Sequence, residues 1–173
     1  MSFNTRKTVC TIFNPCNRRK IVCNSFSAFS LAGCQLLFVK QFKYLGHIID
    51  KSLSDDSDIG RELESLFIKT NVLCRRFKRC STQVKVQLFR SFRVCFYDTA
   101  LWCNFTSSAM NKLASSYCKC IKIFFNVDKY SSVTTMLLNL GLPSFNTLML
   151  NYRFSFARSL SHCDNSLVKR WSS

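Results

Sequence analysis

The residues of this sequence whose types and spacing could do chemistry are mainly cations. Seven Lys and Arg side chains fall within nineteen residues: Arg75, Arg76, Lys78, Arg79, Lys85, Arg90 and Arg93. No carboxylate lies between Glu64 and Asp98 to neutralise them. A cluster of this kind can bind phosphate groups without reading bases, with an affinity that falls steeply as salt rises. The alternative is a solvated helix face balanced by mobile counterions.

Carboxylates and thiols give a weaker signal. Asp55, Asp56 and Asp58 could hold Mg²⁺, but they also suit the first turn of a helix, where negative charge is favoured. The eleven Cys include no Cys-x-x-Cys pair, and Cys118-Lys-Cys120 would direct its two thiols to different sides of a helix. We therefore predict no metal site and no cofactor on this chain. Since no apolar leader follows Met1, we also expect reduced thiols rather than a disulfide framework.

Nor do the remaining polar residues assemble an enzyme site. The four Gly are scattered, so there is no Gly-rich phosphate loop, and neither His47 nor His162 has a sequence partner typical of nucleophilic catalysis. We expect no enzymatic activity and no small-molecule substrate from these residues alone.

The elements that carry the cations should be helices packed around one core. The 173 residues are 47% hydrophobic and include 17 Phe but only 4 Gly and 2 Pro, a composition that excludes a disordered basic tail and argues against a many-turned β-sandwich. The net charge of +16 favours a polyanionic partner. Residues 131–152 carry no charge, yet Asn, Gly and Pro interrupt them, so we predict two short helices there and no membrane span.

Charge and periodicity divide the chain into two predicted domains, residues 1–52 and 53–173. Residues 1–49 contain seven cations and no carboxylate, whereas residues 50–64 hold six of the nine carboxylates. The first domain should contain short strands, predicted at residues 8–13, 20–24, 36–39 and 42–49. In the last of these, Phe42, Tyr44, Gly46 and Ile48 would share one face.

The second domain should contain about five helices. Helical periodicity starts near Ser54 or Ser57, and Ser81, Ser107, Ser131 and Ser144 mark the beginnings of the next four helices. In the second helix we expect the inward residues to be Val84, Leu88, Phe92, Cys95 and Phe96. The predicted fold class is therefore α+β, with a small antiparallel β edge followed by a helical bundle.

Two motifs, in this order along the chain, give this sequence a family resemblance. Asn4-Thr-Arg-Lys-Thr8 precedes an apolar strand, and Phe42-Lys-Tyr-Leu-Gly46 with Ile48 follows it. Together they resemble the reverse transcriptases of non-LTR (LINE-type) retrotransposons, in which an Asn-x-x-Lys-Thr element closes the palm and a Phe-x-Tyr-Leu-Gly segment forms the primer-grip hairpin. The later helices resemble the thumb and post-thumb region of that family, through Arg76-Phe77, Cys80-Ser81, Val84-Lys85, Leu88-Phe89, Tyr97, Leu101-Trp102 and Lys112-Leu113.

The resemblance implies specific roles for several residues. Lys7 would match the palm lysine that protonates the leaving pyrophosphate. The primer grip would consist of Phe42, Tyr44, Leu45 and Gly46. The cations that track the backbone of an RNA–DNA or DNA duplex would be Arg75, Arg76, Lys78 and Arg79, with Lys85, Arg90 and Arg93 beside them.

One departure from the family changes the expected activity. The family binds catalytic Mg²⁺ at palm aspartates that include a Tyr-x-Asp-Asp turn, and this sequence contains no such turn, since Ser54 precedes Asp55-Asp56. We therefore expect a truncated palm edge and thumb that bind a template–primer but do not polymerise alone. The fingers and the rest of the palm would be a separate or missing segment.

Two alternatives stay open from the residues. The chain could be a free-standing basic helical module that binds RNA or DNA non-specifically. It could also be a degenerate reading frame, or a helical interaction protein, without a selected nucleic-acid function. An intracellular location, nuclear or cytoplasmic, is expected in each case.

Overall fold

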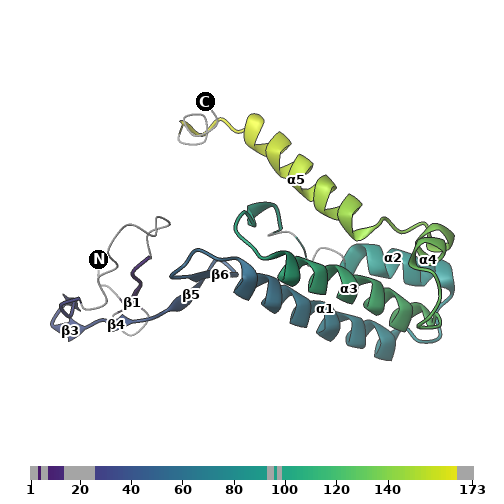
Figure 1. Ribbon diagram of the computed structural model, residues 1–173, viewed down its shortest axis with the longest axis horizontal. Helices are drawn as coiled ribbons and strands as arrows, with labels where there is room; N and C mark the ends of the chain where they lie inside the picture. Colours follow the sequence, from purple (N-terminus) through teal and green to yellow (C-terminus); the bar gives the residue numbers. More distant parts are fainter. Residues whose placement is uncertain (1–3, 5–7, 14–25, 93–95, 97–98, 167–173) are drawn as a thin grey trace. The chain divides into compact units, whose positions relative to one another are not determined.

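The computed structural model describes residues 4, 8–13, 26–92, 96 and 99–166, and these form an α+β protein (Figure 1). The predicted fold class is therefore confirmed. The chain divides into two compact units, one made of residues 1–58 and 103–105, the other of residues 59–102 and 106–173. The predicted domain boundary after residue 52 falls inside the first of these units.

The described residues of the first unit form three short pairs of strands. Its strands are β1 (Val9–Cys10), β2 (Ser30–Leu31), β3 (Cys34–Gln35), β4 (Leu37–Phe38), β5 (Gln41–Tyr44) and β6 (His47–Asp50). The pairs β2–β3 and β5–β6 are antiparallel, as expected of the β edge, whereas β1 and β4 pair in parallel. Of the predicted strands, residues 20–24 lie outside the described part of the chain.

The single strand predicted over residues 42–49 is wrong, because the chain reverses in its middle. Leu45 and Gly46 both have positive φ, 48° and 96°, and Tyr44 pairs with His47 across them. Positive φ at both central residues is the signature of a type I′ turn, whose twist matches that of the flanking strands. The reversal places Phe42 opposite Ile49, so these two share a face that the sequence pattern had separated.

The five predicted helices are all present. They are α1 (Asp56–Arg76), α2 (Thr82–Phe92), α3 (Ser107–Phe125), α4 (Val133–Leu140) and α5 (Phe145–Ser161). Side-chain oxygens cap them as the sequence suggested, with shifts of one residue. Ser81 and Ser144 cap α2 and α5, but Thr106 rather than Ser107 caps α3, and Ser132 rather than Ser131 caps α4.

Aromatic rings form the centre of the helical unit. Tyr117 on α3 is fully buried, with its ring centroid 6.0 Å from that of Phe89, 6.5 Å from Phe96 and 6.0 Å from Phe145. Its hydroxyl donates to the carbonyl of Pro143 at 3.0 Å, which ties the start of α5 to α3. A buried tyrosine needs such a partner for its O–H.

The inward face of α2 differs from the prediction. Phe89 is buried, whereas Val84 is 46% exposed and Leu88 is half-buried. Both Leu88 and Phe89 are apolar, so periodicity alone does not choose between them, and the larger ring packs against the aromatic cluster because it buries more area. Phe96 is buried as predicted, while the side chains of Phe92 and Cys95 lie outside the described part.

Residues 131–152 form two helices, as predicted, joined at Gly141. That residue caps α4 in the left-handed conformation, and α5 begins four residues later. No single helix among the described residues is long and apolar enough to cross a membrane. Only α4 and α5 taken together meet the length and hydropathy conditions, and they are bent by 57° at the break.

Candidate nucleic-acid interface

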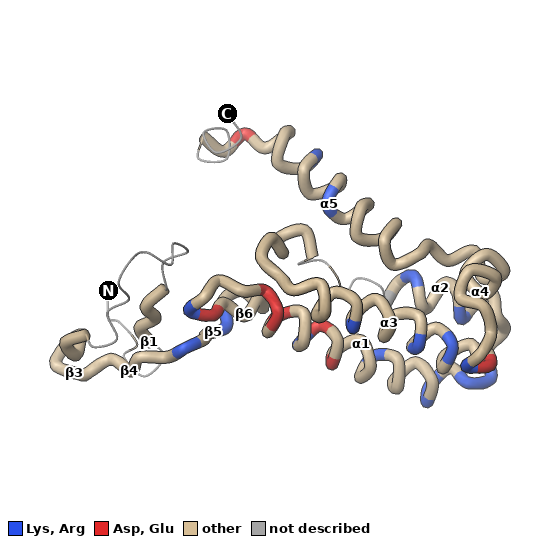
Figure 2. Tube along the Cα trace, viewed as in Figure 1, with Lys and Arg blue, Asp and Glu red and all other residues tan. Residues whose placement is uncertain are grey.

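The cationic cluster predicted from sequence is centred on the connection between α1 and α2 (Figure 2). Arg75 and Arg76 occupy the last turn of α1, where cations complement the negative end of the helix dipole. Phe77 is half-buried, and its amide donates to the carbonyl of Leu73 at 2.9 Å, which continues the helical hydrogen-bond pattern by one residue.

The four cations nearest this connection face solvent. Arg75, Arg76, Lys78 and Arg79 are all exposed. None of them forms an ion pair with another described residue, which agrees with the absence of carboxylates between Glu64 and Asp98. Unpaired, hydrated cations are the groups that can exchange counterions for phosphates at low cost.

Two of the other three predicted cations contact residues of the helical unit. The Nζ of Lys85 lies 5.7 Å from the ring centroid of Phe124, a cation–π contact with the helical core. The Nη2 of Arg90 donates to the carbonyl of Gly141 at 2.7 Å and so ties α2 to the end of α4. Arg93 lies outside the described residues. The cluster of seven therefore contains a solvent-facing group of four and two members with contacts inside the helical unit.

The residues that resemble a primer grip lie on the β5–β6 hairpin. Phe42 is half-buried, Tyr44 is 60% exposed and Leu45, in the turn, is 83% exposed. Gly46 supplies the second positive φ of the turn rather than the close backbone approach that a glycine within a strand suggests. Lys7, the predicted palm lysine, lies outside the described residues.

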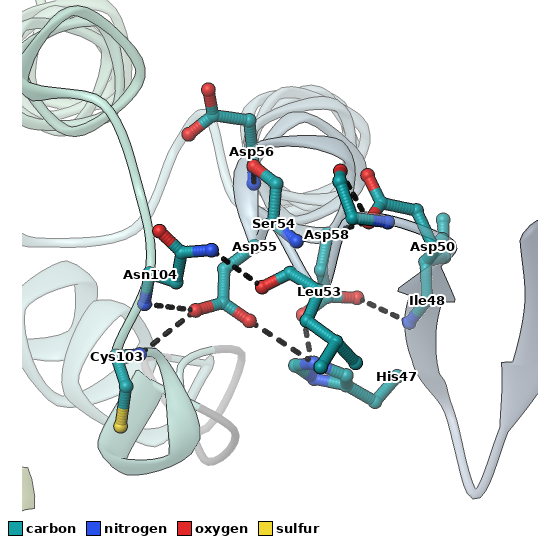
Figure 3. A network of polar contacts seen from close by, with 11 residues as sticks. His47, Ile48, Asp50, Leu53, Ser54, Asp55, Asp56, Asp58, Cys103 and Asn104 are labelled. Atoms are coloured by element: carbon teal, nitrogen blue, oxygen red, sulfur yellow. Dashed lines mark hydrogen bonds and ion pairs between the residues drawn. The ribbon is translucent and has the colours of Figure 1, made fainter. Parts of the chain in front are cut away.

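A network of carboxylates holds this hairpin to the start of α1 (Figure 3). Asp58 is fully buried; its Oδ1 accepts the amide of Ile48 at 3.0 Å, and its Oδ2 lies 3.0 Å from Nδ1 of His47. The other ring nitrogen, Nε2, lies 3.6 Å from Oδ1 of Asp55. His47 is therefore largely buried between two carboxylates.

The second carboxylate of the network reaches a distant segment. Oδ2 of Asp55 accepts the amides of Cys103 and Asn104, each at 2.8 Å, and the side chain of Asn104 donates to the carbonyl of Leu53 at 2.9 Å. Within the described part of the chain, no group of three or more His, Cys, Asp or Glu residues could hold a metal ion. The carboxylates at the start of α1 thus organise backbone amides.

Sequence reasoning missed two features of these units. It did not foresee that Asp58 and His47 meet, because the apolar pattern predicted one continuous strand over residues 42–49, although the family resemblance implied a hairpin there. It also assigned no binding role to Lys112, Lys119 and Lys122 on α3, of which only Lys112 entered the family resemblance. Their spacing of seven and three residues, which places them along one helical face, was the signal that could have found them.

Four of the described thiols fall into two pairs that differ in burial. Burial raises the pKa of the Cys118 thiol, against the opposing effect of nearby Lys122, and burial likewise raises the pKa of Cys74, against Lys85. Cys34 and Cys103 are exposed. Because the thiolate is the nucleophile, a raised pKa lowers the reactive fraction at neutral pH.

We therefore expect iodoacetamide at neutral pH to label Cys34 and Cys103 before Cys74 and Cys118, as measured by mass spectrometry of the peptides over time. The difference should narrow as the pH is raised, since the thiolate fraction of the slow pair then increases. In denaturant the four rates should converge. Equal rates in the folded protein would contradict this assignment.

Comparison of the chain with protein-family models, with curated proteins and with solved structures finds no match in any of the three.

Proposed function

We propose that this chain binds the phosphate backbone of a nucleic-acid duplex, as the palm edge and thumb of a non-LTR retrotransposon reverse transcriptase. The observation that carries the proposal is the group of four exposed cations, Arg75, Arg76, Lys78 and Arg79, at the connection between α1 and α2. We refer to these four residues as the basic junction. Their charge and exposure support this binding independently of the family resemblance.

The arrangement of the basic junction suits backbone contact rather than base readout. Two of its members end α1 and two lie in the turn that follows, so the group is not confined to one helix face. Lys and Arg at such a position can follow phosphates on a duplex without entering a groove deeply. Within this segment Phe77 is half-buried, while the four cations around it are exposed.

The β5–β6 hairpin supports the more specific part of the proposal. A Phe-x-Tyr-Leu-Gly segment that forms a tight two-residue hairpin, with Tyr44 and Leu45 exposed, has the form that the family's primer grip requires. Binding, and not polymerisation by these 173 residues, is the proposed activity, because the sequence has no Tyr-x-Asp-Asp turn to hold Mg²⁺. The partners would be an RNA–DNA duplex and the segments that supply fingers and catalytic palm.

The test is the affinity of the chain for an RNA–DNA duplex, measured by fluorescence anisotropy across a salt series. Replacing all four residues of the basic junction by Ala should weaken binding by at least about tenfold at moderate salt. It should also reduce the slope of log K against log salt by about 2–4, since each lost phosphate contact removes about one released counterion.

A matched variant removes the same charge elsewhere. Lys51, Lys112, Arg153 and Arg158 are exposed cations outside the basic junction, and replacing them by Ala lowers the net charge equally. If binding depends on the basic junction, this control should lose much less affinity and keep most of its salt slope. Equal losses of affinity in the two variants would show that binding depends on net charge and not on the basic junction. If the affinity of the unaltered chain did not change with salt, phosphate binding would be excluded.

A further inference from the structure

A groove in the helical unit is lined by none of the four residues of the basic junction. It has a volume of about 920 Å³ and is bordered by the second half of α3, the α3–α4 connection and the first residues of α4 and α5. Several of its lining residues are exposed, including Ile123 at 47% and Val133 at 37%, so the groove is open to solvent rather than enclosed.

The charge of this groove has one sign. Lys119, Lys122 and Lys129 line it, and no Asp or Glu does. Lys122 is held in place, since its Nζ donates to the carbonyls of Lys129 and Ser131, each at 2.7 Å. Lys119 and Lys129 are exposed at the rim and are able to meet an anionic partner.

One carboxylate next to the groove offsets part of its positive charge. Asp128 lies between the lining residues Val127 and Lys129, is not itself part of the lining, and accepts the amide of Tyr130 at 2.8 Å. Three lysines against one neighbouring carboxylate leave a positive rim, which favours a partner that carries negative charge.

The apolar residues of the lining favour an acidic peptide over a single-stranded nucleic acid. It is mainly aliphatic, with Ile123, Val127 and Val133, and its one aromatic ring, Phe145, is only 6% exposed. Single-stranded nucleic acids bind largely by stacking successive bases on exposed aromatic faces, and the lining residues offer none. The exposed ring of Tyr130 lies beside the groove, and the Nζ of Lys129 is 4.6 Å from its centroid. Aliphatic side chains of a peptide would instead bury against Ile123 and Val133.

We propose that this groove docks an acidic peptide segment that carries aliphatic side chains. The aliphatic side chains would occupy the space between α3 and α4, and the carboxylates of the peptide would meet Lys119 and Lys129 at the rim. This site is separate from the basic junction, and its occupant is a protein rather than a duplex.

The experiment measures anisotropy of a labelled synthetic peptide of about four helical turns, with Leu at i, i+4 and i+7 on one face and Glu at most other positions. The full chain should bind it, and the variant that combines Lys119→Glu with Lys129→Glu should lose about tenfold or more in affinity, because two attractive contacts become repulsive. The matched control combines Lys112→Glu with Arg158→Glu, exposed cations that do not line the groove. It should change the affinity by less than about threefold.

A second variant tests the apolar half without altering charge. Ile123→Ser should weaken peptide binding by about threefold to tenfold, and a peptide with its Leu replaced by Ser should bind the unaltered chain as poorly. Circular dichroism and thermal melting of each variant would show that the fold is retained. The proposal is overturned if the peptide does not bind, or if the two charge-reversal variants bind it equally well. It is also overturned if a single-stranded oligonucleotide, and not the peptide, binds the chain and loses affinity only in the Lys119 and Lys129 variant.

Discussion

Replacing Tyr117 by Ala is expected to lower the free energy of unfolding of the helical unit by about 3–5 kcal/mol, the range measured for large aromatic truncations in cores. The side chain is 0% exposed and its ring lies among Phe89, Phe96 and Phe145, which come from three different segments of the chain. Deleting the ring removes its buried area and leaves a cavity that these neighbours cannot fill without shifting. Urea unfolding followed by far-UV circular dichroism measures the effect.

Tyr117→Phe is the matched control for this prediction. It keeps the ring and removes only the hydroxyl that donates to the carbonyl of Pro143. The expected cost is about 1 kcal/mol, the usual net value of one hydrogen bond. If the two variants had similar unfolding free energies, the ring contacts would not be the source of stability, and the position of Tyr117 at the centre of the core would be wrong.

Replacing Asp58 by Ala is expected to destabilise the β5–β6 hairpin and the start of α1 by about 2–3 kcal/mol. The carboxylate is fully buried and satisfies the amide of Ile48 while contacting His47. Its removal leaves buried polar groups without a partner, which costs more than the loss of an exposed bond. Hydrogen exchange at the amide of Ile48 should become markedly faster, and urea unfolding should begin at lower denaturant.

Asp56→Ala removes a carboxylate from the same helical turn and serves as the comparison. Loss of a favourable charge near a helix N-terminus costs about 0.3–1 kcal/mol, so this variant should be clearly more stable than the Asp58 variant. Unchanged exchange at Ile48 in the Asp58 variant would show that the buried carboxylate does not hold the hairpin.

The helices were predictable because their signals are local. The apolar periodicity, the serines before each helix and Gly141 after α4 act within a turn or two of the residues that they organise, and the structure confirms five helices at those places. Errors of one residue at the caps of α3 and α4 arise where Thr106-Ser107 and Ser131-Ser132 offer two adjacent hydroxyls.

The β5–β6 hairpin was harder to predict because its turn contains Leu rather than the Asn or Asp usual before Gly. Leu45 takes a positive φ that a leucine rarely adopts, and an alternating apolar run across it resembles one continuous strand. Only the pairing of Tyr44 with His47 shows the reversal, and the contact between His47 and Asp58 depends on it.

For the candidate site, composition and order along the chain determined which cations lack neighbouring carboxylates, and that result needed no structure. Tertiary structure decided how they are used: Arg90 bonds to Gly141, Lys85 lies over Phe124, and the four residues of the basic junction stay in solvent. It also decided that Lys119 and Lys129 share a groove with Ile123 and Val133. Charge is a property of each residue by itself, whereas exposure and neighbours depend on contacts between residues far apart in the chain, which no local pattern encodes.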